Sequence, residues 1–487
     1  MRLSTFTDEA RLALETLVER AQEIARPGVR LGVTGLSRAG KTVFITALVH
    51  NLIHGGRLPM FAPAAAGRIA GAKLDPQPDD AVPRFDYEAH IGALVHDRLW
   101  PQSTRMVSEL RLTVAYESAT FLGRHLGRGS LTVDIVDYPG EWLLDLSLME
   151  RDYAQWSAEA IGRLAARPAG EAGAALAAAL QATDPAAPES EAEARRLAAL
   201  FTAHLKARRA DPEALAADPP GRFLMPGDLE GSPLLTFAPL MLPPGQAAAA
   251  GSLAAMMARR YESYRNHVVR PFFRDHFARL DRQIVLVDVL SALDRGPGAV
   301  RELQRVLTEV MAAFRPGRLS FLSGLIDRRI DRILFAATKA DHLHHQDHDR
   351  LEAILARMVA DASARARYAG ATVQIAALAA VRATRQALVR QGSERLPAIT
   401  GVPMAGEVID GEVYDGQTEI ALFPGDLPAD PGVVFGLGGE AGLPPGTLRF
   451  ARFRPPKLEQ GPDGLTLVLP HIRLDRALDF LLGDRLA

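Results

Sequence analysis

Eight consecutive residues near the N-terminus constrain the fold of this chain more than any other feature. The run Gly35-Leu36-Ser37-Arg38-Ala39-Gly40-Lys41-Thr42 matches G-x-x-x-x-G-K-[ST], with an apolar strand before it and an apolar-periodic helix after it. In such a unit the glycines let successive backbone N–H groups point inward and form, with the positive end of the helix, a cradle for phosphate. The alternative is a glycine-rich turn that carries a lysine by chance.

The residue types of this loop predict separate roles. Lys41 is expected to reach the β- and γ-phosphates, and Thr42 to ligate Mg²⁺. The nucleotide contacts that we predict from this loop are Gly35, Ser37, Arg38, Ala39, Gly40, Lys41 and Thr42.

Two further motifs follow at the ends of predicted strands. In LTVDIVDYPGEW, Asp137 and Gly140 form D-x-x-G, which predicts a carboxylate that holds Mg²⁺ through water and an N–H that bonds the γ-phosphate. A later strand, 333–337, runs into Thr338-Lys339-Ala340-Asp341, which is T-K-x-D. The Asp341 carboxylate can accept from both N1–H and the 2-amino group of guanine, which adenine does not offer, while the Lys339 stem lies over the base. Either motif alone is compatible with an ordinary turn, but the three in this order reinforce one another.

The order of apolar runs predicts an α/β fold with a mainly parallel six-stranded sheet. Strand-like runs follow the phosphate loop at 110–116, 131–136, 284–290, 333–337 and 372–378, and the last three are each followed by helix-like stretches. An alanine-rich stretch with helical periodicity interrupts this rhythm. We therefore predict an N-terminal amphipathic helix at 1–28, a P-loop core at 29–144 and 282–392, a helical insertion at 145–281, and a C-terminal β-rich lobe at 393–487 that ends in a helix.

Composition excludes several classes of function. The 487 residues carry 56 basic and 58 acidic side chains, a net charge of −2, so no global field attracts nucleic acid, and we expect no nucleic-acid partner. There is no cysteine, which excludes disulfides, thiolate metal sites and cysteine nucleophiles. The best apolar stretch, 237–257, is broken by prolines and a glycine, so we expect no membrane span. Peripheral membrane contact stays open.

Beyond these motifs, the chain resembles the YcjX-like family of bacterial P-loop GTPase-like proteins. The resemblance is carried by GLSRAGKT, WPQSTRMVSELRL, DYPGEW, RPFFRDHFARLDRQIVLVDVL, TKAD and PHIRLDRALDFLLGD, which span nearly the whole chain. It implies a GTPase-like core, a large helical insertion and a cytoplasmic, stress-associated setting. By position it also implies Thr104 as the switch threonine and Mg²⁺ ligand, with Ser103 as the alternative. Backbone amides that meet the base oxygen are implied at Ala376, Ala377 and Leu378.

One departure concerns hydrolysis. Glu141 stands where many GTPases place the glutamine that orients the attacking water, and a carboxylate near the γ-phosphate is unfavourable unless its charge is offset. We therefore expect slow hydrolysis, with Lys41, Thr104, Glu141 and Arg38 as the catalytic candidates. Arg38 and Arg105 are candidate charge stabilisers, and for each the alternative is a surface or ion-paired arginine.

Two other segments resemble binding sites and are expected to be structural. The stretch 342–348 is dense in histidine, and we expect a solvated helix start there in preference to a metal site. The run ARRYESYRNHVVRPFFRDHFARLDR interleaves arginines with aromatics, and we expect a core-packing helix, with Tyr261 and Tyr264 on one stripe.

The sequence therefore predicts a Mg²⁺-dependent protein that binds GTP and GDP, acting as a slow GTPase switch. Its unidentified protein partner is expected to engage the helical insertion. Two alternatives stay open: a nucleotide-gated scaffold with little hydrolysis, and an ATP-dependent NTPase in which T-K-x-D is accidental.

Overall fold

The computed structural model describes most of the chain. The described residues are 28–36, 38–77, 79–102, 104, 106–119, 129–211, 218–242, 248–312, 330–391, 394–409, 411–436, 443, 446–458 and 468–487. The predicted N-terminal helix, Ser37, Ser103 and Arg105 lie outside them. The described residues form two compact units: a sheet unit within Met1–Asp137, Arg279–Asp294 and Arg315–Ala487, and a helical unit within Tyr138–Ala278 and Arg295–Phe314.

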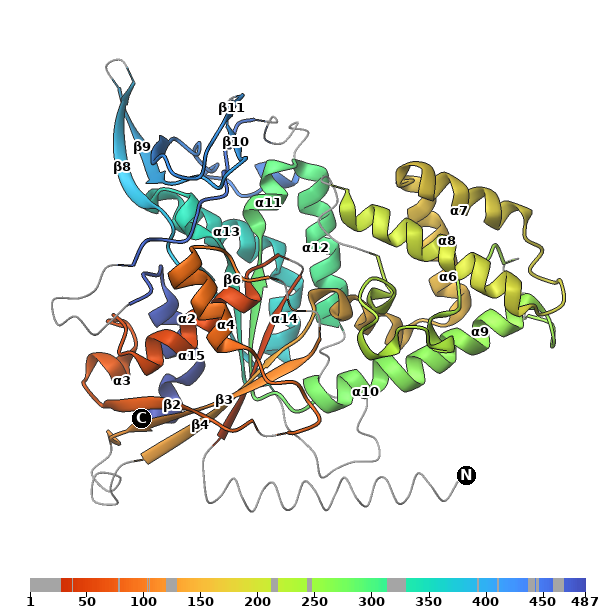
Figure 1. Ribbon diagram of the computed structural model, residues 1–487, viewed down its shortest axis with the longest axis horizontal. Helices are drawn as coiled ribbons and strands as arrows, with labels where there is room; N and C mark the ends of the chain where they lie inside the picture. The colour runs from red at the N-terminus through yellow and green to blue at the C-terminus, as the bar shows by residue number, and fades with distance from the viewer. Residues whose placement is uncertain are drawn as a thin grey trace. The chain divides into compact units, whose positions relative to one another are not determined.

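A seven-stranded sheet organises the sheet unit, in the spatial order β2-β3-β4-β1-β5-β6-β7. Figure 1 labels β2, β3, β4 and β6 of this sheet. Its strands are β1 (Gly28–Gly35), β2 (Ile69–Asp75), β3 (Ser108–Tyr116), β4 (Gly129–Asp137), β5 (Arg282–Val287), β6 (Arg332–Ala337) and β7 (Thr372–Ala377). From β4 to β7 neighbouring strands are parallel, while β2 and β3 are antiparallel additions at one edge. The predicted α/β class with a mainly parallel sheet is confirmed.

The predicted count of six strands is wrong, because β2 was missed. Its sequence, IAGAKLD, is poor in β-branched and aromatic residues, and Gly71 lies beside a register shift in its pairing with β3. As an edge strand that is nowhere fully buried, it also lacks the continuous apolar run that marked the central strands.

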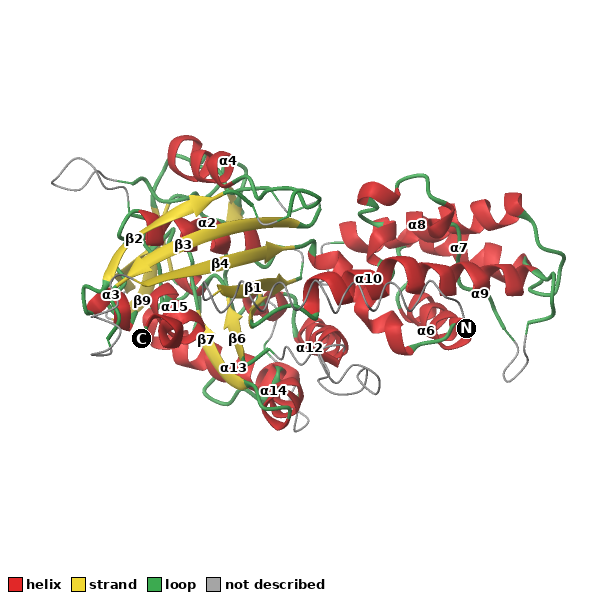
Figure 2. Cartoon of the chain, turned by 90° about the horizontal axis from the view of Figure 1, so that it is seen from below, coloured by secondary structure: helices red, strands yellow, loops and turns green. Residues whose placement is uncertain are grey.

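The sheet unit also contains short and medium α-helices. They are α2 (Lys41–Ile53), α3 (Ala62–Ala65), α4 (Tyr87–Gly92), α11 (Val289–Asp294), α13 (His348–Met358), α14 (Ala360–Tyr368) and α15 (Leu474–Leu482). Figure 2 shows them in red around the yellow sheet. α2 directly follows β1, so the phosphate loop joins the centre of the sheet to the N-terminus of this helix.

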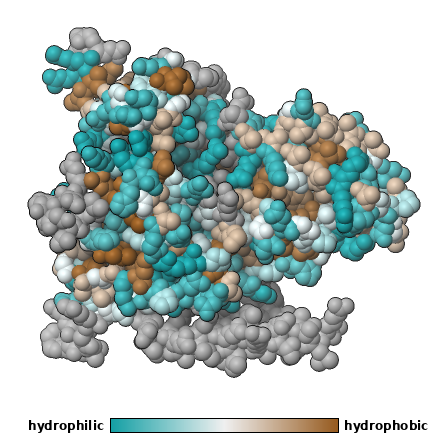
Figure 3. Space-filling model, in the orientation of Figure 1, coloured by the Kyte–Doolittle hydropathy of each residue, from teal (hydrophilic) through white to brown (hydrophobic). Residues whose placement is uncertain are grey.

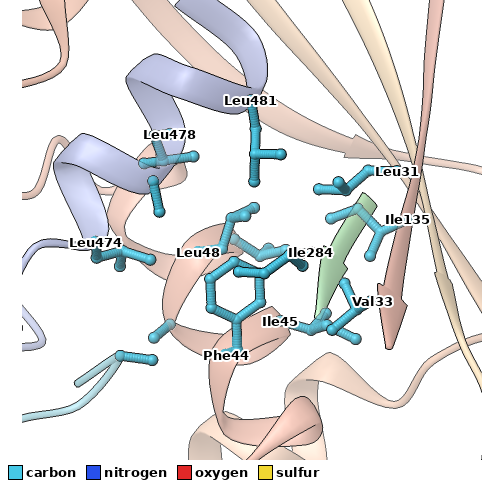
Figure 4. Packing of buried hydrophobic residues seen from close by; sticks show 14 of the residues in the cluster. Leu31, Val33, Phe44, Ile45, Leu48, Ile135, Ile284, Leu474, Leu478 and Leu481 are labelled. Carbon is cyan, nitrogen blue, oxygen red and sulfur yellow. The ribbon is translucent and has the colours of Figure 1, made fainter. Parts of the chain in front are cut away.

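The core of the sheet unit is built from the first and last helices of the described chain. Leu474, Leu478 and Leu481 of α15 belong to one apolar cluster with Phe44, Ile45 and Leu48 of α2 and with Leu31, Val33, Ile135 and Ile284 of the strands (Figure 4). The prediction had assigned this closing helix to the C-terminal lobe. Its packing against α2 instead makes the end of the chain part of what supports the phosphate loop.

The remaining C-terminal residues form small antiparallel sheets. One has the order β12-β9-β8, with β8 (Arg385–Gln391), β9 (Glu394–Gly401) and β12 (Ile420–Leu422), and the other pairs β10 (Val408–Ile409) with β11 (Glu412–Val413). Ile399, Leu422, Ala451 and Phe453 form a separate small core beneath the three-stranded sheet.

The described elements of the helical unit are helices. Its α-helices are α6 (Tyr153–Ala166), α7 (Gly170–Ala182), α8 (Glu191–Ala210), α9 (Leu253–Tyr264), α10 (Arg270–Phe272) and α12 (Pro297–Ala312). Trp156 is fully buried, stacks on Tyr261 with ring centroids 5.0 Å apart, and contacts Phe201 and Phe237 edge-on. Tyr261 and Tyr264 are both buried in this cluster, which confirms that their helix packs into a core.

The boundaries of the helical unit differ from those of the predicted insertion. The unit begins at Tyr138, whose ring lies 4.7 Å from that of Phe277, and it includes α12, whose Glu302 pairs with Arg167 and Arg208. Periodicity alone did not reveal these long-range pairs.

The visible surface is mainly hydrophilic, with scattered hydrophobic residues (Figure 3). Within the described part of the chain, no helix is long and apolar enough to cross a membrane.

Candidate functional site

The phosphate-loop motif forms a tight connection between β1 and α2. Arg38 and Gly40 have positive φ values of 64° and 88°, which turn the chain sharply before the helix begins at Lys41. A Cβ atom at Gly35 would lie 2.7 Å from the carbonyl oxygen of Leu286, so the loop leaves β1 in direct contact with the neighbouring strand. Ala39 is buried and Arg38 is exposed.

Lys41 and Thr42 are held at the N-terminus of α2. Their side chains are 7% and 6% exposed, although both are polar. The Lys41 ammonium donates to the carbonyl oxygens of Gly35 at 2.8 Å and Leu36 at 3.2 Å, so it curls back over the loop. The first turn of α2 contains no acidic residue to oppose an anion there.

Three predicted metal ligands from separate segments come together beside this helix. The hydroxyl of Thr42 lies 3.2 Å from that of Thr104, and the Thr104 hydroxyl donates to the Asp137 carboxylate. Asp137 is the last residue of β4 and lies in register with Val33 of β1, which explains why it faces the loop. Two hydroxyls and a carboxylate are hard oxygen donors of the kind that suits Mg²⁺.

The T-K-x-D motif lies at the end of β6, in the same sheet unit. Thr338 donates its backbone N–H to Val287 at 2.9 Å, and Lys339, at a positive φ of 62°, pairs its ammonium with Asp288. Burial by itself raises the pKa of Asp288, but the Lys339 charge and hydrogen bonds from Ser291 outweigh it and hold that pKa below its usual value. Asp288 therefore fixes the direction of the Lys339 stem.

Asp341 is anchored by the segment that follows β7. One of its carboxylate oxygens accepts the Ala383 N–H at 2.8 Å, and its carbonyl accepts the Thr384 hydroxyl. The adjacent Ala340 N–H donates to Leu378 at 3.1 Å. The loop after β6 and the segment after β7 are thus tied together.

The amides implied at the end of β7 are engaged differently from the expectation. The Ala377 N–H donates to Glu352 at 2.9 Å, and the Leu378 N–H donates to Ala337 at 2.8 Å. Ala376 lies within the strand, paired with Ala336. This arrangement disfavours Ala377 and Leu378 as donors to a base, because strand pairing and α13 already use them.

The D-x-x-G glycine and the residue after it belong to the helical unit. Gly140 begins a 3₁₀-helix, Gly140–Glu150, directly after the end of β4. The Glu141 carboxylate lies 2.7 Å from a guanidinium nitrogen of Arg209 on α8. Asp137 belongs to the sheet unit, and Gly140, three positions later in the chain, belongs to the helical unit.

The histidine-rich stretch is partly buried: His345 is exposed as expected of a solvated helix start, but His344 and His348 are not. His344 and His348 are 4% and 5% exposed, and a ring nitrogen of His348 lies 2.9 Å from the Ala340 carbonyl. Burial lowers the pKa of both imidazoles. Among the described residues, no group of three or more His, Asp or Glu side chains is arranged to hold a metal ion.

Sequence reasoning missed two site residues. Asp288 had a signal, since it is the polar residue that ends the apolar strand QIVLV on the same sheet edge as Thr338. Arg209 had none, because its partner Glu141 lies 68 positions earlier in the chain and nothing in the pattern of α8 marks that one arginine.

Comparison with known proteins gives a consistent result. The model of the YcjX-like family, DUF463, matches residues 29–486. A "Ras-like GTPase YcjX" from Escherichia coli is 37% identical over 471 residues, which cover 94% of this chain and 96% of that protein. A protein of the same name from Shewanella oneidensis is 34% identical over 501 residues, covering 98% and 99%.

Proposed function

The chain belongs to the YcjX-like family, and we propose that it is a Mg²⁺-dependent guanine-nucleotide-binding protein that hydrolyses GTP slowly. The observation that carries this proposal is the convergence of Thr42, Thr104 and Asp137 at the N-terminus of α2. Three separate segments supply these oxygens, and each was expected on independent grounds. The names of the relatives support a GTPase-like function at the coarse level.

The phosphates bind, in this proposal, where the Lys41 ammonium now contacts Gly35 and Leu36. Phosphate oxygens replace these carbonyl acceptors, and charge-assisted bonds to an anion are stronger than those to a neutral carbonyl. The amides of the loop and the positive end of α2 add to the attraction.

Thr42, Thr104 and Asp137 hold Mg²⁺ directly or through water. A Mg²⁺ ion held there would supply positive charge to stabilise the phosphates during phosphoryl transfer. The protein's contribution is to gather these oxygens, because the Thr104 hydroxyl lies within hydrogen-bonding distance of both the Thr42 hydroxyl and the Asp137 carboxylate.

Guanine is selected by Asp341, with the Lys339 stem lying over the base. The tie between Asp341 and Ala383 leaves the second carboxylate oxygen to accept from the base edge, and Asp288 directs Lys339. This is the part of the proposal that excludes adenine nucleotides.

Slow hydrolysis follows from Glu141, a carboxylate at the position that orients water. The helical unit, whose first described residues include Gly140 and Glu141, is proposed to respond to the γ-phosphate and to present a surface to a protein partner. A single-turnover assay with the partner separates this switch from a scaffold that binds GTP and barely hydrolyses it.

Magnesium linkage tests the site directly. Thr42→Ala and Asp137→Ala should each weaken binding of a non-hydrolysable GTP analogue by about tenfold or more in Mg²⁺, and by far less in EDTA, because they remove metal ligands and leave the phosphate loop intact. Thr113→Ala, a hydroxyl that hydrogen-bonds Asp75 at the edge of the sheet, is the matched control. Equal losses with and without magnesium would show that these residues do not hold the ion.

A further inference from the structure

The chain that leads to Thr104 is tied to the C-terminal lobe at two points. The indole N–H of Trp100 donates to the carbonyl oxygen of Phe453 at 2.7 Å, and Arg98 donates to that of Pro455 at 3.1 Å. Trp100 lies four positions before Thr104, and its ring packs against the apolar cluster that supports α2. These residues all belong to the sheet unit.

The two acceptor carbonyls lie on one edge of an extended segment whose other edge is already paired. On that other edge, the Arg452 carbonyl accepts from Met404 at 2.7 Å and the Arg454 N–H donates to Val402 at 2.8 Å. In antiparallel pairing only alternate residues bond to the neighbouring strand, so the two carbonyls just described point away from it. The lobe therefore fixes these acceptors through its own backbone pairing.

The same lobe also holds the base-reading loop, residues 338–341. The Phe453 ring lies 5.7 Å from the ring of His342, edge-on at 88°. Ala383, whose N–H donates to Asp341 at 2.8 Å, packs against the small core that contains Phe453. The ring of Phe453 thus contacts the residue after Asp341, while the carbonyl of the same residue holds Trp100.

We infer that the C-terminal lobe couples guanine recognition to the metal site, with Trp100 as the positioning residue for Thr104. The inference rests on the proposed function, in which Thr104 holds Mg²⁺ and Asp341 reads guanine. A tether four residues from Thr104 restricts the chain that carries its hydroxyl, so less conformational entropy is lost when that hydroxyl is ordered beside the metal. Trp100 acts through Thr104 rather than on the nucleotide.

This coupling predicts that magnesium strengthens the preference for guanine. Inosine triphosphate lacks the 2-amino group, so it offers Asp341 one donor where GTP offers two. Asp341 and Thr104 are held by the same lobe, so the contact that GTP makes and inosine triphosphate lacks should contribute more when the metal is bound. By reciprocity, Mg²⁺ should bind more tightly in the presence of the guanine nucleotide.

The experiment measures the dissociation constants of non-hydrolysable GTP and inosine triphosphate analogues on the full chain, each in Mg²⁺ and in EDTA. For the wild type, the ratio of the inosine constant to the guanine constant should be about fivefold higher in Mg²⁺ than in EDTA. Trp100→Phe keeps an aromatic ring and removes the N–H donor. It should abolish this difference and reduce the gain in GTP affinity from Mg²⁺ about fivefold.

A double variant and a control show whether Trp100 acts through Thr104. Thr104→Ala should reduce the gain from Mg²⁺ at least as much as Trp100→Phe, and Trp100→Phe/Thr104→Ala should match Thr104→Ala alone. Tyr153→Phe is the matched control, because it removes a buried hydroxyl that donates to a backbone carbonyl, that of Ala238 at 2.8 Å, in the helical unit. It should leave both ratios at their wild-type values.

Ratios measured on one sample do not depend on the fraction of protein that is folded. An unchanged gain from Mg²⁺ in Trp100→Phe, or a further loss when it is added to Thr104→Ala, would overturn the positioning role. If Trp100→Phe does not fold, the wild type still decides, because equal guanine preference in Mg²⁺ and EDTA would overturn the coupling. A full gain from Mg²⁺ in Thr104→Ala would instead overturn the metal role of Thr104 in the proposed function, and this inference with it.

Discussion

Asp341 is the residue on which base selection depends in this account. One carboxylate oxygen is occupied by the Ala383 N–H, so the two oxygens have different tasks: one positions the side chain and the other meets the base. A substitution that keeps the first task and alters the second can therefore separate structure from specificity.

Asp341→Asn is that substitution. Its carbonyl oxygen can still accept from Ala383, while its NH₂ group donates where the carboxylate accepted, so we expect loss of GTP binding by about a hundredfold and a gain of xanthosine triphosphate, whose 2-oxo group accepts. Asp349→Asn, at an acid that is 87% exposed on α13, serves as the control. Unchanged preference for GTP in competition assays would mean that Asp341 does not contact the base.

At the scale of elements, the 3₁₀-helix after β4 depends on Asp145. Burial raises the pKa of this carboxyl to about 6 from its usual 3.8, against the opposing hydrogen bonds from Tyr264 and Gly221. The folded protein therefore keeps a proton that the unfolded chain releases at lower pH. The stability that Asp145 contributes is complete below about pH 4 and is lost as the pH rises through about 6.

Asp145→Asn should remove this dependence. The free energy of unfolding of the wild type, minus that of the variant, should fall by about 3 kcal/mol between pH 4 and pH 7, which corresponds to about two pKa units. Urea unfolding at several pH values measures it, and the subtraction cancels the titration of the other groups. A difference that stays constant over this range would contradict the buried, protonated state.

Some helices and strands can be predicted from the sequence, and others cannot. The central strands and α2 are predictable because apolar period and the phosphate-loop motif are local signals, and they place Lys41, Thr42 and Asp137 correctly on their elements. β2 was not predicted because this edge strand, in which no residue is fully buried, has no continuous apolar run. The packing of α15 on α2 could not be predicted from the sequence. An amphipathic pattern shows that one face of a helix is buried, but it does not show which element covers that face.

Ion pairs and hydrogen bonds between residues far apart in the sequence could not be predicted either. The Arg209–Glu141 and Lys339–Asp288 pairs depend on how distant elements pack, and the use of the Ala377 and Leu378 amides by Glu352 and Ala337 is visible only once the strand register is known.

For the whole molecule, the account requires that the helical unit respond at the end that carries Gly140. We expect amide exchange in 141–152 to slow with a non-hydrolysable GTP analogue relative to GDP, since a γ-phosphate contact at Gly140 restrains the 3₁₀-helix. Strand β5, a fully buried neighbour of the central strand β1, should be equally protected in both states and serves as the internal control. Identical exchange maps would favour a constitutive scaffold over a switch.

Guanine-nucleotide binding at the phosphate loop can be measured by a competition titration of GTP, GDP and ATP against a labelled guanine nucleotide in Mg²⁺. The account predicts that GTP and GDP displace the label at concentrations at least about a hundredfold below ATP. It also predicts that binding is lost in Lys41→Ala and kept in Lys73→Ala, whose lysine is 73% exposed on β2. Equal displacement by ATP, or full binding by Lys41→Ala, would contradict it.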